Sequence, residues 1–407
     1  MMMMICCTGS TKVRGLMGQS RAKVHSAVTT ELAGARRISI GMDVWSKKGL
    51  TASFLGVSCA FYSPLQRKPL HVLLNLHTIA HPHTGDMLAE KLASSLKQWK
   101  VDGSKVMMVV TDNGSNMVKA VNSVRVSDEQ ELDMNNAIDH NRHNVESETN
   151  DGSADDDMTL LTDDDSEDEV EADDEEELED VGEIETAVMH RLPCVAHTLQ
   201  LVLKELDKVD SCKNLLVKVR GIVRTVRVSS VATEKLIQKC GKTLVTDCST
   251  RWNSVYFMMN RMLEIKGSLN EVLEGLKYDS LTFTEWNRLS ELTRLLKPFM
   301  DQTNNLQTDT LSLSCVIPSL MELSLHLQDR SFTKSFSLPL LNSLKHRFAV
   351  FLDPSCDMFD PLAASACLLD PTVMVIMLRD DMVQLLNAAK TYIHEQVNLH
   401  YKNLSVV

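Results

Sequence analysis

The chain has 407 residues, of which 43% are hydrophobic and 24% charged, so it can fill one large domain or two ordinary ones with a buried core. No apolar run approaches the roughly 18 residues of a membrane-spanning helix, so the sequence predicts no membrane span. Ten cysteines spread over this length do not suit a dense disulfide framework, and they fit a reducing intracellular compartment.

The formal net charge of −13 comes from one segment of the chain. Residues 151–185 contain 20 Asp or Glu and no Lys or Arg, whereas the remainder has 42 basic and 35 acidic residues. Like charges repel one another and bury little surface, so we expect residues 124–186 to form a disordered insert. The mildly basic remainder favours a nucleic-acid partner.

The first half of the chain, taken in order, predicts strands followed by an alternation of helix and strand. Residues 1–24 show no periodicity and carry scattered basic side chains, so we expect a disordered lead-in. The expected strands and helices lie at residues 37–44, 51–62 and 70–76 (strands), 84–99 (helix), 105–111 (strand) and 115–121 (helix). Thr84 is the expected N-cap of the first helix.

Beyond the insert, residues 187–194 predict a fifth strand, and apolar stripes at helical spacing then predict six or more helices. A short strand-like piece interrupts them at residues 243–246. The expected domains are a first core part, a fifth strand of the same core and a helical domain, at residues 25–123, 187–197 and 198–407. This order matches an RNase H-like layout. The predicted fold is therefore α/β plus all-α, with a mixed sheet interrupted by a long helical insertion.

Two acidic residues follow the buried parts of two predicted strands, Asp43 after the first and Asp112 after the fourth. Carboxylates on neighbouring strands can hold Mg²⁺, which clamps the attacking and leaving oxygens of a phosphodiester. Asp is also common in turns that end strands, and that simpler interpretation stays open.

Cys194 and His197 form a C-x-x-H pair, but no second Cys or His pair stands nearby to complete the four ligands of a structural zinc site. We therefore expect no zinc site and interpret the pair as a packed thiol and imidazole where a strand meets a helix. Arg251 and Trp252 precede a helix, where a Trp is more often a core anchor than a base-stacking side chain.

One predicted helix carries five basic residues with no acid between them, namely Lys213, Lys218, Arg220, Arg224 and Arg227. Several of them lie opposite the apolar stripe of that helix. A solvated helix face explains them most simply. A surface that contacts DNA phosphates is the alternative, and it would make binding strongly salt-dependent.

Four segments together resemble one family. They are S-I-G-M-D-V-W-S at residues 39–46, V-T-D-N-G-S-N-M-V-K-A-V at 110–121, C-V-A-H-T-L-Q-L-V at 194–202 and T-R-W-N-S-V-Y at 250–256. Their order and spacing resemble the hAT transposases, and most closely their domesticated vertebrate relatives, the zinc finger BED domain-containing proteins. The resemblance covers roughly residues 35–371, with the acidic tract as an insertion.

The resemblance implies an RNase H-like core, with Asp43 and Asp112 matching the first and second catalytic acids. It implies that Cys194, His197, Arg251 and Trp252 flank the site. In active relatives Mg²⁺ supports strand cleavage and transfer by in-line attack, so Mg²⁺ is the cofactor to expect if there is one.

The sequence also departs from the family pattern. The third acid is a Glu on a core helix after the insertion, and Glu395 is the only Glu after residue 371, without family context around it. An N-terminal BED finger and a C-terminal dimerisation segment are not found either. We therefore expect a fragment or degenerate product that is not an active transposase, and homo-oligomers only in a full-length form.

Three functions follow as hypotheses. The first is a transposase-derived, DNA-associated protein of the nucleus that regulates transcription without catalysis. The second is an active DNA transposase that uses Asp43, Asp112 and a metal ion. The third is a protein-interaction scaffold that docks partners on its helical domain and acidic tract.

Overall fold

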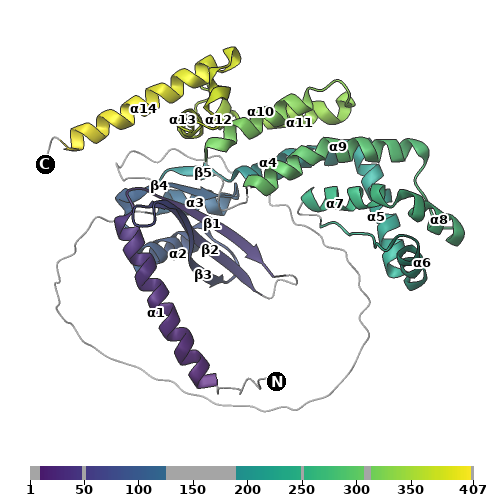
Figure 1. Cartoon of the computed structure of the whole chain (residues 1–407), viewed down its shortest axis with the longest axis horizontal. Coiled ribbons are helices and arrows are strands. Elements are labelled where there is room, and N and C mark those ends of the chain that lie inside the picture. The colour runs from purple at the N-terminus through teal and green to yellow at the C-terminus, as the bar shows by residue number, and fades with distance from the viewer. Residues whose placement is uncertain (1–9, 48–51, 125–188, 249–251, 307–312, 405–407) are drawn as a thin grey trace, which may run out of the picture. The chain divides into compact units, whose positions relative to one another are not determined.

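The computed structural model describes residues 10–47, 52–124, 189–248, 252–306 and 313–404 (Figure 1). The expected insert at 124–186 therefore lies, apart from its first residue, outside the described residues. None of the helices in these ranges combines the length and apolarity of a membrane-spanning helix.

A five-stranded mixed sheet confirms the predicted fold class. Its strands are β1 (Ile38–Ser46), β2 (Ser53–Ser63), β3 (Lys68–Ile79), β4 (Val106–Thr111) and β5 (Arg191–Pro193). They lie in the order β3-β2-β1-β4-β5, with β1 to β3 as an antiparallel meander and with β4 and β5 parallel to β1. The first and third predicted strands are shorter than β1 and β3, whereas the second is one residue longer than β2 and the fifth is longer than β5. Asp43 lies within β1, as the prediction of a strand at 37–44 has it.

One face of the sheet is covered by α2 (Gly85–Gln98) and α3 (Ser115–Ser123). The alternate residues Leu55, Val57 and Cys59 of β2 are fully buried on this face, as the period of two in a strand requires. Thr84 caps α2 as predicted, since its Oγ1 accepts a hydrogen bond of 3.3 Å from the backbone N–H of Met87.

The prediction of a disordered lead-in at residues 1–24 is wrong for residues 10–24, which belong to the helix α1 (Ser10–Gly34). Residues 1–9 lie outside the described residues. Helix-forming residues such as Lys, Arg, Met and Ala build this helix without an apolar stripe. Among its side chains that the structure describes, from residue 19 on, only Leu32 is buried. A search for periodicity therefore misses it.

The opposite face of the sheet divides into two parts. On β4 and β5, Met108 and Leu192 belong to the same buried cluster as the side chains of the helical domain. On β1 to β3, the corresponding positions include four large apolar side chains that are 41–58% exposed, namely Trp45, Tyr62, Leu73 and Leu76. The helical domain therefore covers only the β4–β5 side.

The rest of the described chain is helical. The α-helices are α4 (Val195–Leu203), α5 (Asp210–Val228), α6 (Ser230–Cys240), α7 (Trp252–Glu264), α8 (Lys266–Leu276), α9 (Phe283–Leu306), α10 (Val316–Leu327), α11 (Lys334–Arg347), α12 (Ala349–Leu352), α13 (Leu362–Leu369) and α14 (Val383–Leu404). Short 3-10 helices lie at Gly103–Lys105 (η1), Lys204–Lys208 (η2), Leu313–Cys315 (η3), Met374–Leu378 (η4) and Asp380–Met382 (η5). The predicted stripes form their common core, with the exception of Phe257, which is 46% exposed.

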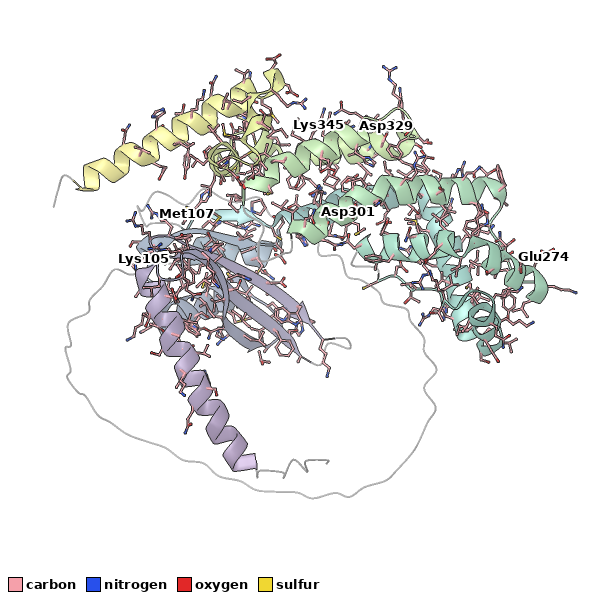
Figure 2. All side chains as sticks on the ribbon, in the orientation of Figure 1. Lys105, Met107, Glu274, Asp301, Asp329 and Lys345 are labelled. Carbon is pink, nitrogen blue, oxygen red and sulfur yellow. The ribbon has the colours of Figure 1, made fainter. Side chains whose placement is uncertain are left out.

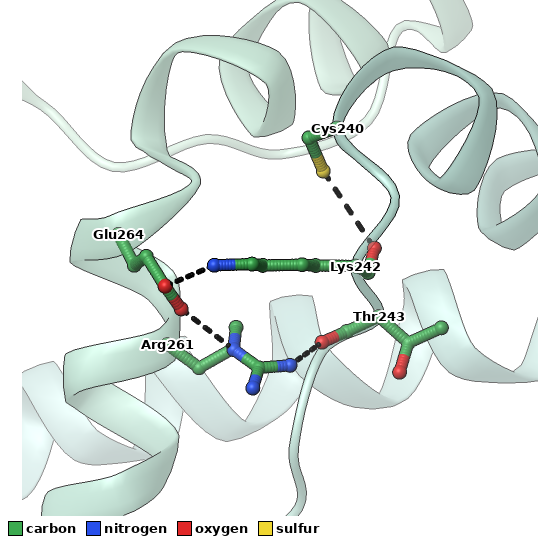
Figure 3. Close-up of polar contacts among 5 residues, drawn as sticks. All are labelled: Cys240, Lys242, Thr243, Arg261 and Glu264. Atoms are coloured by element: carbon green, nitrogen blue, oxygen red, sulfur yellow. Dashed lines mark hydrogen bonds and ion pairs between the residues drawn. The ribbon is translucent and has the colours of Figure 1, made fainter.

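The strand predicted at residues 243–246 is wrong, because this stretch pairs with no strand and is held by side chains instead. Arg261 donates a hydrogen bond to the carbonyl oxygen of Thr243 over 2.6 Å. The Glu264 carboxylate accepts hydrogen bonds from both Arg261 and Lys242 (Figure 3). Arg227 donates to the carbonyl oxygen of Leu244 over 2.7 Å. Guanidinium groups thus donate to these backbone carbonyls the hydrogen bonds that a neighbouring strand would otherwise donate.

Candidate functional site

The ends of three neighbouring strands bring Asp43, Asp112 and Cys194 into one row. Gly41 of β1 pairs with Val110 of β4, which pairs with Leu192 of β5. Each of the three site residues lies two positions further along its strand, so all three project from the same face. Neighbouring strands are about 4.8 Å apart. The charges of both carboxylates raise the pKa of the Cys194 thiol, which agrees with this row.

The loop that carries Asp112 is braced by Arg191, the first residue of β5. The Arg191 guanidinium donates through Nε to Thr111 Oγ1 over 2.8 Å, and through Nη2 to Asn113 Oδ1 over 2.9 Å and to the carbonyl oxygen of Asp112. Burial lowers the pKa of Arg191, and the charge of Asp112 opposes this effect. The Asp112 carboxylate itself accepts the backbone N–H of Gly114 over 3.0 Å.

The same loop is tied to α4. The Cys194 backbone N–H donates to the carbonyl oxygen of Thr111 over 2.7 Å, and the Asn113 amide donates to Thr198 Oγ1 over 3.3 Å. Asp112 is thus held in place by the strand before it and by the strand and helix that follow the acidic tract. Sequence reasoning missed Arg191, which stands in no quoted motif, and Thr198, which lies inside the 194–202 segment without being named there as a site residue.

Cys194 is the N-cap residue of α4, with its side chain largely buried. Burial is the main cause of its raised pKa, the two carboxylates add to it, and hydrogen bonds from the backbone of His197 and Ala196 oppose it. The thiol therefore stays protonated near neutral pH, whereas nucleophiles and metal ligands are thiolates. This agrees with the prediction of a packed thiol where a strand meets a helix.

A magnesium ion suits the oxygen donors of Asp43 and Asp112, since Mg²⁺ is commonly held by one or two carboxylates and keeps several waters. Within the described ranges, no group of three or more His, Cys, Asp or Glu side chains is placed to hold a metal ion. The structure thus brings the two acids together, and their role as metal ligands or catalysts stays a prediction.

Two residues of the predicted site are not placed. Arg251 lies outside the described residues, and Trp252 opens α7 in a position where only its backbone is described. Their association with the acid pair stays a prediction. His197 lies half-buried in the first turns of α4.

The five basic residues of α5 do not form one free cationic face. Lys218 pairs with Glu285 at 2.8 Å, Arg220 with Asp247 at 2.8 Å, and Arg227 holds the carbonyl of Leu244. Lys213 and Arg224 are exposed. Arg227 is exposed too, but like Lys218 and Arg220 it fastens α5 to a neighbouring segment, and a role of the five residues in DNA contact stays a prediction.

The matched family models cover the sheet and the start of the helical domain. Residues 41–141 match the ZBED1 RNase-like domain, and residues 192–295 match the ZBED1 RNase-like helical domain. Together the two matches span about half of the 407 residues.

Three curated relatives illustrate the range of similar proteins. Human "Zinc finger BED domain-containing protein 4" is 29% identical over 191 residues, which are 44% of this chain and 16% of the relative. "Putative transcriptional regulator tpeD" of Talaromyces stipitatus is 21% identical over 336 residues, 75% of this chain and 34% of the relative. "Putative AC transposase" of Zea mays is 32% identical over 122 residues, 27% of this chain and 15% of the relative. The chain thus spans about a third or less of their lengths.

The strand order, the acidic pair at the β1–β4 edge and the helices that follow β5 define an RNase H-like protein of the transposase type. Within that class, this chain belongs to the hAT-like family that includes the zinc finger BED domain-containing proteins.

Proposed function

We propose that the chain is a transposase-derived, DNA-associated regulator of the nucleus that binds DNA without cutting it. The observation that carries the DNA-associated part of this proposal is the transposase-type core itself, whose strand ends align Asp43, Asp112 and Cys194. Similar proteins include a putative transcriptional regulator and a zinc finger BED domain-containing protein, which supports a regulatory function.

The proposed lack of cleavage is supported by the number of acids, because no third carboxylate among the described residues joins Asp43 and Asp112 in a metal-binding group. Asp43 and Asp112 contribute two negative charges, and the guanidinium of Arg191 next to Asp112 offsets one of them. A bound Mg²⁺ would supply a Lewis acid that polarises a phosphate oxygen, and Asp43 and Asp112 are the residues that would hold it. Arg191 and the Gly114 backbone N–H would keep the Asp112 carboxylate oriented.

Two alternatives have specific support. An active hAT-type transposase is favoured by the alignment of the two acids on neighbouring strands. A protein-interaction scaffold is favoured by α5, where three of the five cations are already bound within the chain. The active transposase would cleave DNA, whereas the proposed regulator would not. The scaffold would not bind DNA, whereas the proposed regulator would.

The test is fluorescence anisotropy of a labelled DNA duplex with the purified chain, over a series of salt concentrations. We expect binding that weakens steeply with salt, because phosphate contacts release counterions. Chelation of divalent ions by EDTA should leave the affinity for DNA unchanged, since the proposed binding does not depend on a metal ion. No binding at low salt would overturn the proposal and favour the scaffold.

A further inference from the structure

An open groove of about 580 Å³ lies along α11 and η2, outside the acidic row. Its floor is apolar, formed by Pro339 and by Leu338, whose side chain is 50% exposed. Cations stand at its two ends, Lys334 at one and Arg347 at the other. An exposed leucine between positive ends is a surface that offers both apolar burial and charge pairing.

The charge of α11 is of one sign. Residues 334–348 contain no Asp or Glu, and Lys345 adds a further exposed cation near the end of the helix (Figure 2). Basic residues in the last turn complement the helix dipole, so Lys345 and Arg347 have a local explanation. Lys334 does not, because it occupies the first turn, where the dipole disfavours a cation, and that turn holds no acid.

Lys334 also forms no ion pair within the described ranges of the chain. The acid of the groove, Glu205, is already shared, since it lies 3.1 Å from Lys208 and 3.9 Å from Arg347. Because the contact between Arg347 and Glu205 is long, the Arg347 guanidinium can still pair with another carboxylate. Both ends of the groove can therefore accept an external carboxylate.

We propose that this groove is the docking site for an acidic peptide segment of a partner protein, with apolar side chains at its centre and carboxylates on both sides. The apolar centre covers Leu338 and Pro339, and the carboxylates pair with Lys334 and Arg347. Lys334 and Arg347 are 13 positions apart on α11, which corresponds to about 20 Å at the rise of a helix. An extended peptide of about six residues spans that length.

An apolar floor distinguishes this partner from DNA. A DNA phosphate backbone can pair with cations but buries no apolar surface against Leu338. A leucine of a peptide, in contrast, buries apolar surface against both Leu338 and Pro339. This docking is independent of the proposed DNA binding, so either can fail alone.

The test uses the full chain and a fluorescein-labelled peptide with two leucines flanked on each side by three aspartates. Lys334→Gln with Arg347→Gln should weaken binding about tenfold, and Leu338→Ser should weaken it severalfold. The charge-matched control Lys235→Gln with Lys277→Gln, at exposed sites on α6 and after α8, should leave the affinity unchanged. Thermal unfolding confirms that each variant is folded.

Three outcomes would overturn the proposal. The groove variants could bind the peptide as well as the unaltered chain does. A peptide with serines in place of the leucines could bind equally well, which would show charge attraction alone. An unlabelled DNA duplex could displace the peptide stoichiometrically, while Lys334→Gln with Arg347→Gln abolishes DNA binding, which would assign the groove to DNA.

Discussion

Arg191 is the side chain on which the position of Asp112 depends. Its guanidinium serves three acceptors, on Thr111, Asp112 and Asn113. Removing a donor that serves partly buried acceptors leaves them unpaired, and each such loss costs about 1–3 kcal/mol. We expect Arg191→Gln to lower the free energy of unfolding by about 2 kcal/mol, measured by urea denaturation. Arg330→Gln, at an exposed site, is the control, and equal stabilities of the two variants would contradict the account.

His190 forms a second contact that the sequence did not reveal. Its Nε2 lies 2.5 Å from the buried carboxylate of Asp360, which also accepts the backbone N–H of Leu362 over 2.8 Å. The hydrogen bond with Asp360 raises the pKa of His190 above its usual value, and burial opposes this effect. The pair thus connects the residue before β5 to a residue two positions before α13.

The pH dependence of this contact follows from the raised pKa of His190. Its contribution to stability is fully present below the unfolded-state pKa near 6.5 and disappears as the pH rises through the folded-state pKa. His190→Gln should therefore lower the free energy of unfolding more at about pH 5.5 than at about pH 8.5. Because His190 is half-exposed, the expected difference is below about 1 kcal/mol. His394→Gln is the exposed control, and a larger loss at high pH would contradict the assignment.

The residues of the site could be predicted where a motif marked them and not where only tertiary contact did. Asp43, Asp112 and Cys194 stand at the ends of apolar runs, so the strand pattern alone places them at one edge. Arg191 and Asp360 carry no such mark, because their partners lie 78–80 and 170 positions away along the chain. The cations of α5 were recognisable, but Glu285 and Asp247, which bind two of them, were not.

Among the elements, α1 is held to the rest of the chain by its C-terminal part, as far as its described side chains show. The Glu31 carboxylate accepts hydrogen bonds from Ser63 and Gln66 at the β2–β3 turn, and these bonds lower its pKa. The His25 ring stacks on Trp99 with a centroid distance of 4.4 Å, and Leu32 is 2% exposed.

Two substitutions in α1 test this description. Leu32→Ala should lower the free energy of unfolding by about 2–4 kcal/mol, because it opens a cavity at a buried site. Val24→Ala, at a site of the same helix that is 59% exposed, should change it by less than about 0.5 kcal/mol. Chemical denaturation measures both. A similar loss for the two variants would show that the N-terminal part of α1 is packed as well.

Element prediction succeeded where burial imposes a period. The stripes of α5 and α10 are buried along their length, and β2 alternates as a strand with one covered face does. It failed for α1, which has no stripe. The helix α9 continues past Pro298 to Leu306, although a proline inside a helix commonly kinks or ends it. Tertiary packing stabilises α9 through Phe299 and Thr303 on the far side of the proline.

At the scale of the whole molecule, charge is unevenly distributed along the chain. The 20 acids of residues 151–185 stand against a remainder with a net charge of +7. If the acidic tract competes with DNA phosphates for the cations of the remainder, deletion of residues 151–185 should tighten DNA binding at low salt and much less at high salt. Anisotropy titrations of both chains measure this. An unchanged low-salt affinity would refute the competition.

The claim that this transposase-type core binds DNA without cutting it is tested most directly by incubating the chain with end-labelled duplex DNA in Mg²⁺ or Mn²⁺ and resolving the products on native and denaturing gels. The account predicts a shifted band on the native gel and intact strands on the denaturing gel. Strand cleavage that Asp112→Asn abolishes and Asp380→Asn, at an exposed site, preserves would contradict it.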